Sequence, residues 1–207
     1  MKNLIIVDDF YKNPQLVRDF ALQNDWIEKK QLNQDFPGTE SRRCNFSTEV
    51  VRKISDLVGF KITPEPRKHA FGAFALTTEE DNNKRTIHID GCDWTGVVYL
   101  TPGSNAKGGT SLYRHLATGL NSVPTNDKLN ELGYERLEDF MEHVLKKDGH
   151  NFEKWEVDNF IEMQFNRFIL FRGGQLFHSA DYYFGSNLID GRLVQLFFFN
   201  QSPTVAP

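Results

Sequence analysis

The sequence predicts a mainly β protein with flanking helices, of the sandwich or jelly-roll type. Short runs rich in β-branched and aromatic residues, separated by turn residues, fill much of the chain from residue 69 to residue 200. The 18 phenylalanines concentrate in the last third of the chain, which indicates a packed β interior. A chain of 207 residues is long enough to bury one sizeable core and requires no second one.

The N-terminal elements are expected in the order strand, helix, loop, helix. Leu4 to Val7 predicts an opening strand, and Asn13-Pro14 predicts the start of a helix over residues 14–25. Residues 26–46 are polar, contain Pro37-Gly38 and predict a long surface loop. Ser47 or Thr48 caps a second helix, which Gly59 ends.

The remaining chain predicts the β part of the fold with one helical interruption. The β-rich pieces cover residues 69–78, 86–90, 96–102, 108–115, 160–171, 175–180 and 191–200. Between them, residues 126–148 carry leucines and other apolar residues at helical spacing. We therefore expect a single domain over residues 1–207 with a helical insert at about 126–148.

Composition and charge restrict the partners and the location. Lys plus Arg number 24 and Asp plus Glu number 28, a formal charge of −4 with no long block of like charges, so we expect neither nucleic acid nor a membrane as a partner. Cys44 and Cys92 are too few for a disulfide framework. The apolar run of Leu4 to Val7 is too short for a signal peptide or a span. These features predict a cytoplasmic protein.

One strand of the predicted fold carries two metal-binding residue types on the same face. Side chains alternate along a strand, so His88 and Asp90 point one way while Ile87 and Ile89 point the other. His178, after the Gly173-Gly174 turn, is the natural third ligand. Two histidines and one carboxylate on one face of an octahedral ion leave three positions open, which suits non-haem iron(II).

Arg192 opens a strand that is otherwise largely apolar on both faces. A lone guanidinium in such a strand is costly unless it meets an anion, and its fork matches a carboxylate in two hydrogen bonds. A dicarboxylate that chelates the metal at one end would present its other end to Arg192.

These pieces together resemble the iron(II)/2-oxoglutarate-dependent dioxygenase superfamily, of the prolyl-hydroxylase-like kind. His88-Ile89-Asp90 matches the HxD pair, "GGTSLYRH" (108–115) matches the glycine-glycine turn after the ligand strand, and His178 matches the distal histidine. "GRLVQLFFF" (191–199) matches the strand that carries the arginine for the co-substrate, and residues 4–22 resemble the first strand and helix of the family. The insert and the acidic loop at residues 79–83 lie outside the resemblance.

The resemblance implies a cupin-like double-stranded β-helix that holds Fe(II) through His88, Asp90 and His178 and anchors 2-oxoglutarate through Arg192. Reaction with dioxygen (O2) would release succinate and carbon dioxide and hydroxylate a small molecule or an amino-acid side chain. Halogenating relatives replace the carboxylate that is Asp90 here, so its presence argues against halogenation. Many relatives have a serine at the position of Val194, and Tyr99 is a candidate for the missing co-substrate contact.

Other interpretations of the same residues remain open. His88 with Asp90 also fits an ordinary salt link on an exposed strand, and Arg192 also fits a structural pair with Asp181 or Asp190. The fold also suits a non-catalytic cupin-like metal-binding or ligand-binding protein, or a hydrolase or isomerase that uses zinc or manganese. Arg192 favours the oxygenase, because neither alternative needs a buried cation besides the metal.

Several features leave the substrate open. His115 is interpreted as a surface or substrate-side group outside the metal shell. A loop around Trp94 is expected either to contact substrate or to cover the roll. The loops at residues 26–46, 79–85 and 116–126 contain no pattern that identifies a substrate, and no feature indicates an oligomeric state.

Overall fold

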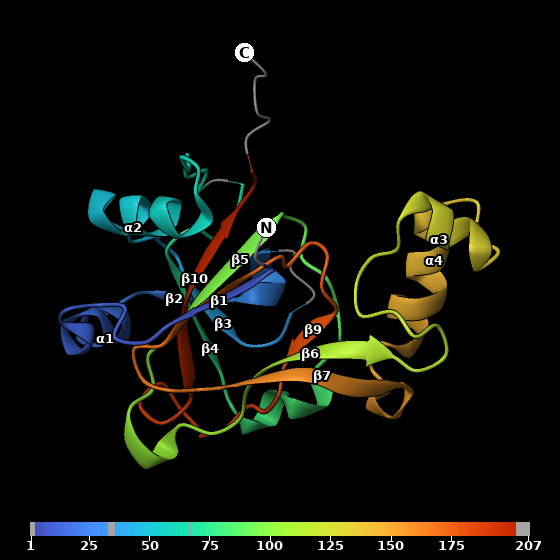
Figure 1. Ribbon diagram of the computed structural model, residues 1–207. Coiled ribbons are helices and arrows are strands. Elements are labelled where there is room, and N and C mark those ends of the chain that lie inside the picture. The colour runs from blue at the N-terminus through green and yellow to red at the C-terminus, as the bar shows by residue number, and fades with distance from the viewer. Residues whose placement is uncertain (1–2, 33–35, 67, 202–207) are drawn as a thin grey trace.

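Two antiparallel β-sheets face each other in the computed structural model, which describes residues 3–32, 36–66 and 68–201 (Figure 1). Within these residues, a seven-stranded sheet has the order β1-β8-β5-β10-β4-β3-β2, and a three-stranded sheet has the order β7-β6-β9. The strands of the large sheet are β1 (Leu4–Val7), β2 (Trp26–Glu28), β3 (Thr39–Ser41), β4 (Ala73–Thr77), β5 (Trp94–Tyr99), β8 (Phe168–Phe171) and β10 (Arg192–Phe199). Those of the small sheet are β6 (Gly109–His115), β7 (Trp155–Glu162) and β9 (His178–Ala180).

The strand order is that of a double-stranded β-helix, which confirms the predicted fold class. Following the chain, β4 lies in the large sheet, residue 88 bridges to β9 of the small sheet, and β5 returns to the large sheet. The hairpin of β6 and β7 then belongs to the small sheet, after which β8, β9 and β10 alternate between the two. The chain therefore winds as a roll of two facing sheets.

Alternation along the strands gives the large sheet two buried faces. The outer face packs against α1 (Pro14–Leu22) and α2 (Thr48–Val58), with Ala21, Ile54, Leu193 and Phe197 fully buried between them. The inner face contributes Val97, Ile169, Val194 and other residues to the core that is shared with the small sheet. As predicted, Ser47 caps α2 by accepting a hydrogen bond from the Val50 N–H (3.2 Å), and Gly59 ends it at φ 79°.

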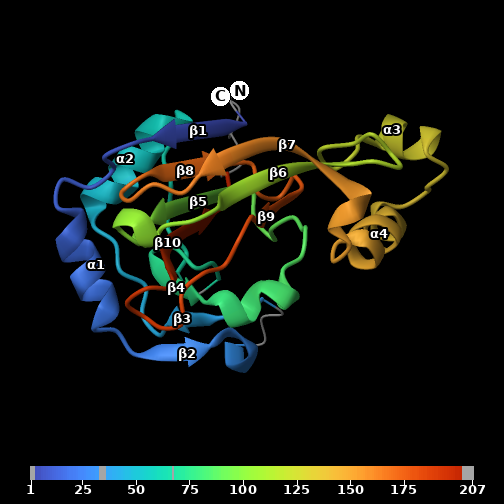
Figure 2. The same ribbon diagram turned by 90° about the horizontal axis from the view of Figure 1, so that it is seen from below.

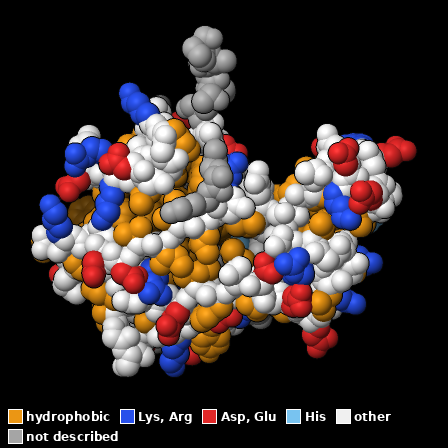
Figure 3. Space-filling model, viewed as in Figure 1, with side chains coloured by type: hydrophobic (Ala, Val, Ile, Leu, Met, Phe, Trp, Pro, Cys, Tyr) orange, Lys and Arg blue, Asp and Glu red, His pale blue; other side chains and the backbone are white. Residues whose placement is uncertain are grey.

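Helices between β6 and β7 form a lobe beside the roll. The lobe contains α3 (Asn126–Glu131), α4 (Leu137–Met141) and a continuing π-helical turn (Glu142–Lys146). It lies on the opposite side of the sheets from α1 and α2 (Figure 2) and presents acidic and basic side chains to solvent (Figure 3). Its inner side packs on a cluster that includes Ile87, Trp155 and Phe177.

The remaining short elements are 3-10 helices at Lys29–Leu32 (η1), Glu79–Lys84 (η2), Gly103–Asn105 (η3) and Phe152–Lys154 (η5). Across the described ranges, no helix has both the length and the apolar character that crossing a bilayer requires.

The structure differs from the prediction at several elements. The first helix ends at Leu22 instead of residue 25. Residues 160–171 form the end of β7, a turn and β8, because Asn166 takes a positive φ of 67° that breaks the strand. Residues 86–90 pair with β9 through one bridge at His88 instead of forming a regular strand.

The predicted loop over residues 26–46 is wrong in part, since it contains β2, η1 and β3; residues 33–35 of that range lie outside the described residues. The two strands have three residues each, so they are too short to show an alternating pattern in the sequence.

Candidate functional site

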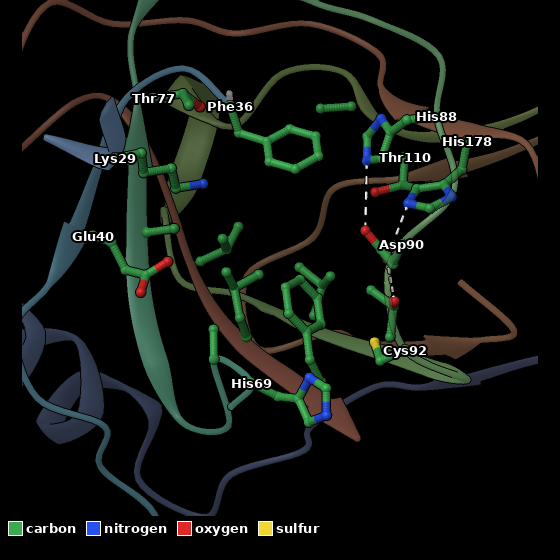
Figure 4. A pocket seen from close by; sticks show the side chains of 18 of the residues that line it. Lys29, Phe36, Glu40, His69, Thr77, His88, Asp90, Cys92, Thr110 and His178 are labelled. Carbon is green, nitrogen blue, oxygen red and sulfur yellow. Dashed lines mark hydrogen bonds and ion pairs between the residues drawn. The ribbon is translucent and has the colours of Figure 1, made fainter. Parts of the chain in front are cut away.

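The structure brings together His88, Asp90 and His178, the three residues that the sequence analysis names as candidate metal ligands. His88 and His178 exchange two backbone hydrogen bonds of 3.0 Å, which hold the two residues side by side although 90 positions separate them. Within the described chain, these residues form the one group of three whose ligand atoms all lie within 4.8 Å of one another. Figure 4 shows the three side chains pointing toward a common centre.

Backbone carbonyls orient both imidazole rings. Nδ1 of His88 lies 2.9 Å from the carbonyl oxygen of Thr86, and Nδ1 of His178 lies 2.9 Å from that of Leu176. A proton on each Nδ1 satisfies these contacts and leaves each Nε2 lone pair directed at the centre. The Nε2 atoms lie 3.6 Å (His88) and 3.3 Å (His178) from the carboxylate oxygens of Asp90.

Asp90 is held by its neighbours on β5 and on the turn after β8. The Thr95 hydroxyl donates a hydrogen bond to Oδ2 of Asp90, and the Asp90 N–H donates to the Gly173 carbonyl (2.9 Å). A Cβ on Gly173 would lie 2.5 Å from Oδ2 and closer still to Oγ1 of Thr95. The carboxylate therefore keeps its position only because residue 173 has no side chain.

The electrostatics of the three residues favour binding of a cation. Burial, together with the charge of His178, lowers the pKa of His88 to about 4, so His88 is neutral near pH 7. Burial opposes charge on the other two residues, but their mutual attraction holds the pKa of Asp90 below and that of His178 above their ordinary values. A divalent ion at the centre would compete with a proton for Nε2 of His178.

Arg192 lies in the same cavity, which has a volume of about 670 Å³. The residue is 8% exposed, and within the described chain its Nε has no hydrogen-bond partner and its guanidinium no ion pair. Asp190 instead accepts backbone N–H bonds from Ser186 and Asn187, and Asp181 lies 3.4 Å from the Ser111 hydroxyl. The structural pairs considered for Arg192 are therefore absent among the described residues.

Tyr99 lies behind the cavity wall. The register of the large sheet places it directly opposite Val194, and the residue is fully buried. Its hydroxyl shares a 2.8 Å hydrogen bond with Oγ1 of Thr110, and its ring centroid lies 5.7 Å from the Arg192 guanidinium carbon. The ring of Tyr99 thus lies near the Arg192 guanidinium but does not line the cavity, whereas Thr110 does.

A family model described as "Family of unknown function (DUF6445)" matches residues 1–199 of the sequence. The chain belongs to the DUF6445 family. A search of curated proteins gives no match to this DUF6445 chain.

Solved structures resemble the DUF6445 chain at 12% sequence identity. HygX from Streptomyces hygroscopicus, crystallised with nickel, 2-oxoglutarate and hygromycin B, has a TM-score of 0.49, and the match covers 94% of this chain and 81% of HygX. A prolyl-4-hydroxylase from Pseudomonas putida has a TM-score of 0.43, with 97% of this chain and 94% of that protein covered.

Several cavity residues of the DUF6445 chain were not among the predicted site residues, and Lys29, Glu40 and His69 are three of them. Lys29 and Glu40 come from the part of the chain that was predicted as a loop, and His69 precedes β4. Glu40 is 8% exposed, and its partner across the sheet, Ala75, also lines the cavity. A buried glutamate on a three-residue strand leaves no recognisable pattern in the sequence.

Two other predictions about the surroundings of the site are wrong. His115 is neither a surface nor a substrate-side group: it is 2% exposed, packs under the lobe and contacts Thr118 and Asp148. Trp94 begins β5 and is 1% exposed, so it belongs to the core and not to a loop. Its ring faces the Arg172 guanidinium at 4.9 Å.

Proposed function

We propose that the protein is an iron(II)- and 2-oxoglutarate-dependent oxygenase that hydroxylates a small molecule or an amino-acid side chain. The observation that carries the proposal is the presence of two kinds of site in one cavity. Three converging ligands suit a metal ion, and a buried guanidinium suits a carboxylate. We place this enzyme in the cytoplasm, as a single domain over residues 1–207 with the helical insert at about 126–148.

The residues present fit both groups. Two neutral imidazole nitrogens and one carboxylate are the donor set of non-haem iron(II) oxygenases, and the Nδ1 contacts already orient both rings. A buried Nε of Arg192 without a hydrogen-bond partner among the described residues fits the distal carboxylate of 2-oxoglutarate. The cavity of about 670 Å³ has the size of an ordinary small-molecule site.

Each residue has a defined part in this proposal. His88, Asp90 and His178 hold the iron, and Thr95 and Gly173 fix the carboxylate of Asp90. When bound, iron and 2-oxoglutarate supply the oxidation by O2 that hydroxylates the substrate and releases succinate and carbon dioxide. Arg192 binds the distal carboxylate of the co-substrate and so orients its other end toward the ligands. Apolar cavity residues exclude water; they are Val97, Phe171, Val194 and Leu196.

The non-catalytic metal-binding protein and the zinc or manganese hydrolase remain the alternative functions. Both explain the three ligands, but neither explains the cost of burying Arg192 without a counter-ion among the described residues. Arg192 therefore favours the oxygenase over them.

The test is conversion of 2-oxoglutarate to succinate by the purified protein with iron(II) and ascorbate, with and without candidate substrates. We expect succinate from the wild type and none from His88→Ala. Arg192→Met should keep metal affinity within about twofold but weaken 2-oxoglutarate binding about 100-fold, since a buried charged hydrogen-bond pair is lost. Arg114→Met, which removes a partly exposed arginine paired with Asp158, is the matched control. Metal binding without any 2-oxoglutarate binding would instead favour the non-catalytic protein.

A further inference from the structure

The cavity contains a second cation that the proposed reaction does not use. Lys29 follows β2 and begins η1, outside the strands that form the roll itself. The backbone N–H of Lys29 donates a hydrogen bond to the Gly38 carbonyl (3.1 Å), and the β2–β3 pairing extends the large sheet beyond β4. Figure 4 shows the Lys29 side chain directed into the cavity from the wall opposite His88 and Asp90.

Among the residues that the structure describes, the ammonium group of Lys29 has no direct partner. Within the described part of the chain, Nζ has neither a hydrogen-bond partner nor an ion pair. Burial lowers the pKa of Lys29, and the nearby Arg192 also disfavours its proton, whereas the charges of Glu40 and Asp90 favour it. A cation held in a cavity without a direct counter-ion is costly, and an incoming anion removes that cost.

The other two cations among the described cavity residues, Lys68 and Arg192, have assigned partners. Lys68 also lines the cavity, but its side chain is 68% exposed and its Nζ lies 2.6 Å from the carboxylate of Glu65. Arg192 is assigned to the co-substrate in the proposed function. Among the described cavity residues, Lys29 is therefore the cation that has no assigned anion.

We propose that Lys29 binds a carboxylate of the substrate, so that the enzyme acts on a small carboxylic acid. This inference rests on the proposed function, which assigns the co-substrate to Arg192. Phe36 lies between Lys29 and His88 in Figure 4, with its ring centroid 4.8 Å from that of His88. The hydrocarbon part of the substrate would pass along Phe36, which places a carbon remote from the carboxylate at the metal ligands.

The test measures ligand binding instead of turnover. Protein loaded with nickel(II) and saturated with 2-oxoglutarate is titrated, by ligand-observed NMR, with aliphatic, aromatic and α-amino carboxylic acids and with the methyl ester of each. We expect the wild type to bind at least one acid ten or more times more tightly than its ester. Lys29→Met should weaken the binding of that acid by about 10- to 100-fold and leave the binding of its ester unchanged.

Two variants serve as controls. Lys68→Met removes the same charge from the rim of the same cavity and should keep acid binding within about twofold, because Lys68 is exposed and paired. Lys29→Arg restores the charge and should recover most of the affinity. Thermal unfolding of each variant establishes that it is folded.

The affinity for 2-oxoglutarate shows whether Lys29 binds the carboxylate of the substrate or a carboxylate of 2-oxoglutarate. The Kd of 2-oxoglutarate in Lys29→Met should stay within about twofold of the wild type. A large rise in this Kd with unchanged acid binding would assign Lys29 to the co-substrate and overturn the proposal. The proposal would also be overturned if no acid of the panel bound more tightly than its methyl ester. Acid binding that depends on Lys29 in a protein that neither binds nor decarboxylates 2-oxoglutarate would support the carboxylate site and refute the oxygenase.

Discussion

Replacing Gly173 by alanine should damage the metal site while leaving the fold intact. A Cβ at residue 173 would lie 2.5 Å from Oδ2 of Asp90, which is shorter than any normal van der Waals contact. It would also overlap the Thr95 hydroxyl that holds this oxygen. Asp90 or Thr95 must move. Disturbing the partner of a metal ligand typically reduces metal affinity about 10- to 100-fold, which equals about 1.4–2.8 kcal/mol. The crowding itself should cost about 1–3 kcal/mol of unfolding free energy.

The assay is a titration with cobalt(II) or nickel(II), together with urea denaturation of the metal-free protein. Gly91→Ala is the matched control, because Gly91 directly follows Asp90 but a Cβ there would meet no atom within 4 Å. We expect wild-type metal affinity in Gly91→Ala. Equal metal affinity in Gly173→Ala and Gly91→Ala would refute the argument that the missing side chain at residue 173 positions Asp90.

Further predictions concern the same site and its surroundings. Thr95→Val removes the hydroxyl that binds Asp90 and should weaken metal binding about tenfold in the same titration; an unchanged Kd would contradict this role. His115→Ala should lower the unfolding free energy by about 2–3 kcal/mol, measured in urea, because it deletes a buried ring and its contact with Asp148, yet it should leave the metal Kd unaltered. A divalent ion at 100 times its Kd should stabilise the wild type by about 2.7 kcal/mol but not His178→Ala; equal stabilisation of both would place the ion elsewhere.

The residue types of the candidate metal site could be predicted from the sequence because the local pattern contains them. Alternation puts His88 and Asp90 on one face, and the structure confirms that Ile87 and Ile89 point the other way, into the cluster under the lobe. The pairing of His88 with His178 is different in kind. Nothing in the spacing of the two residues requires it. The prediction rested on the place of His178 after the Gly173-Gly174 turn, in a strand expected to return across a roll, and the resemblance to a known fold supported it.

The residues that the sequence did not predict are those whose surroundings depend on distant segments. Lys29 and Glu40 reach the cavity because β2 and β3 add to the edge of β4, and strands of three residues carry no periodic signal. Side chains alternate along β6, so the sequence alone places His115 and Tyr113 on the same face of this strand. That both are buried depends on the lobe formed by α3 and α4, which covers this face.

The position of the lobe ties the metal ligands to a region far from the cavity. Ile87 and Phe177 immediately precede the two histidines, are fully buried, and belong to the same hydrophobic cluster as Phe140 of the lobe. Trimming the helices between β6 and β7 would therefore uncover two large apolar side chains, each one peptide bond from an imidazole of the candidate metal site. A shortened chain would lose the backing that keeps both rings aimed at the same point.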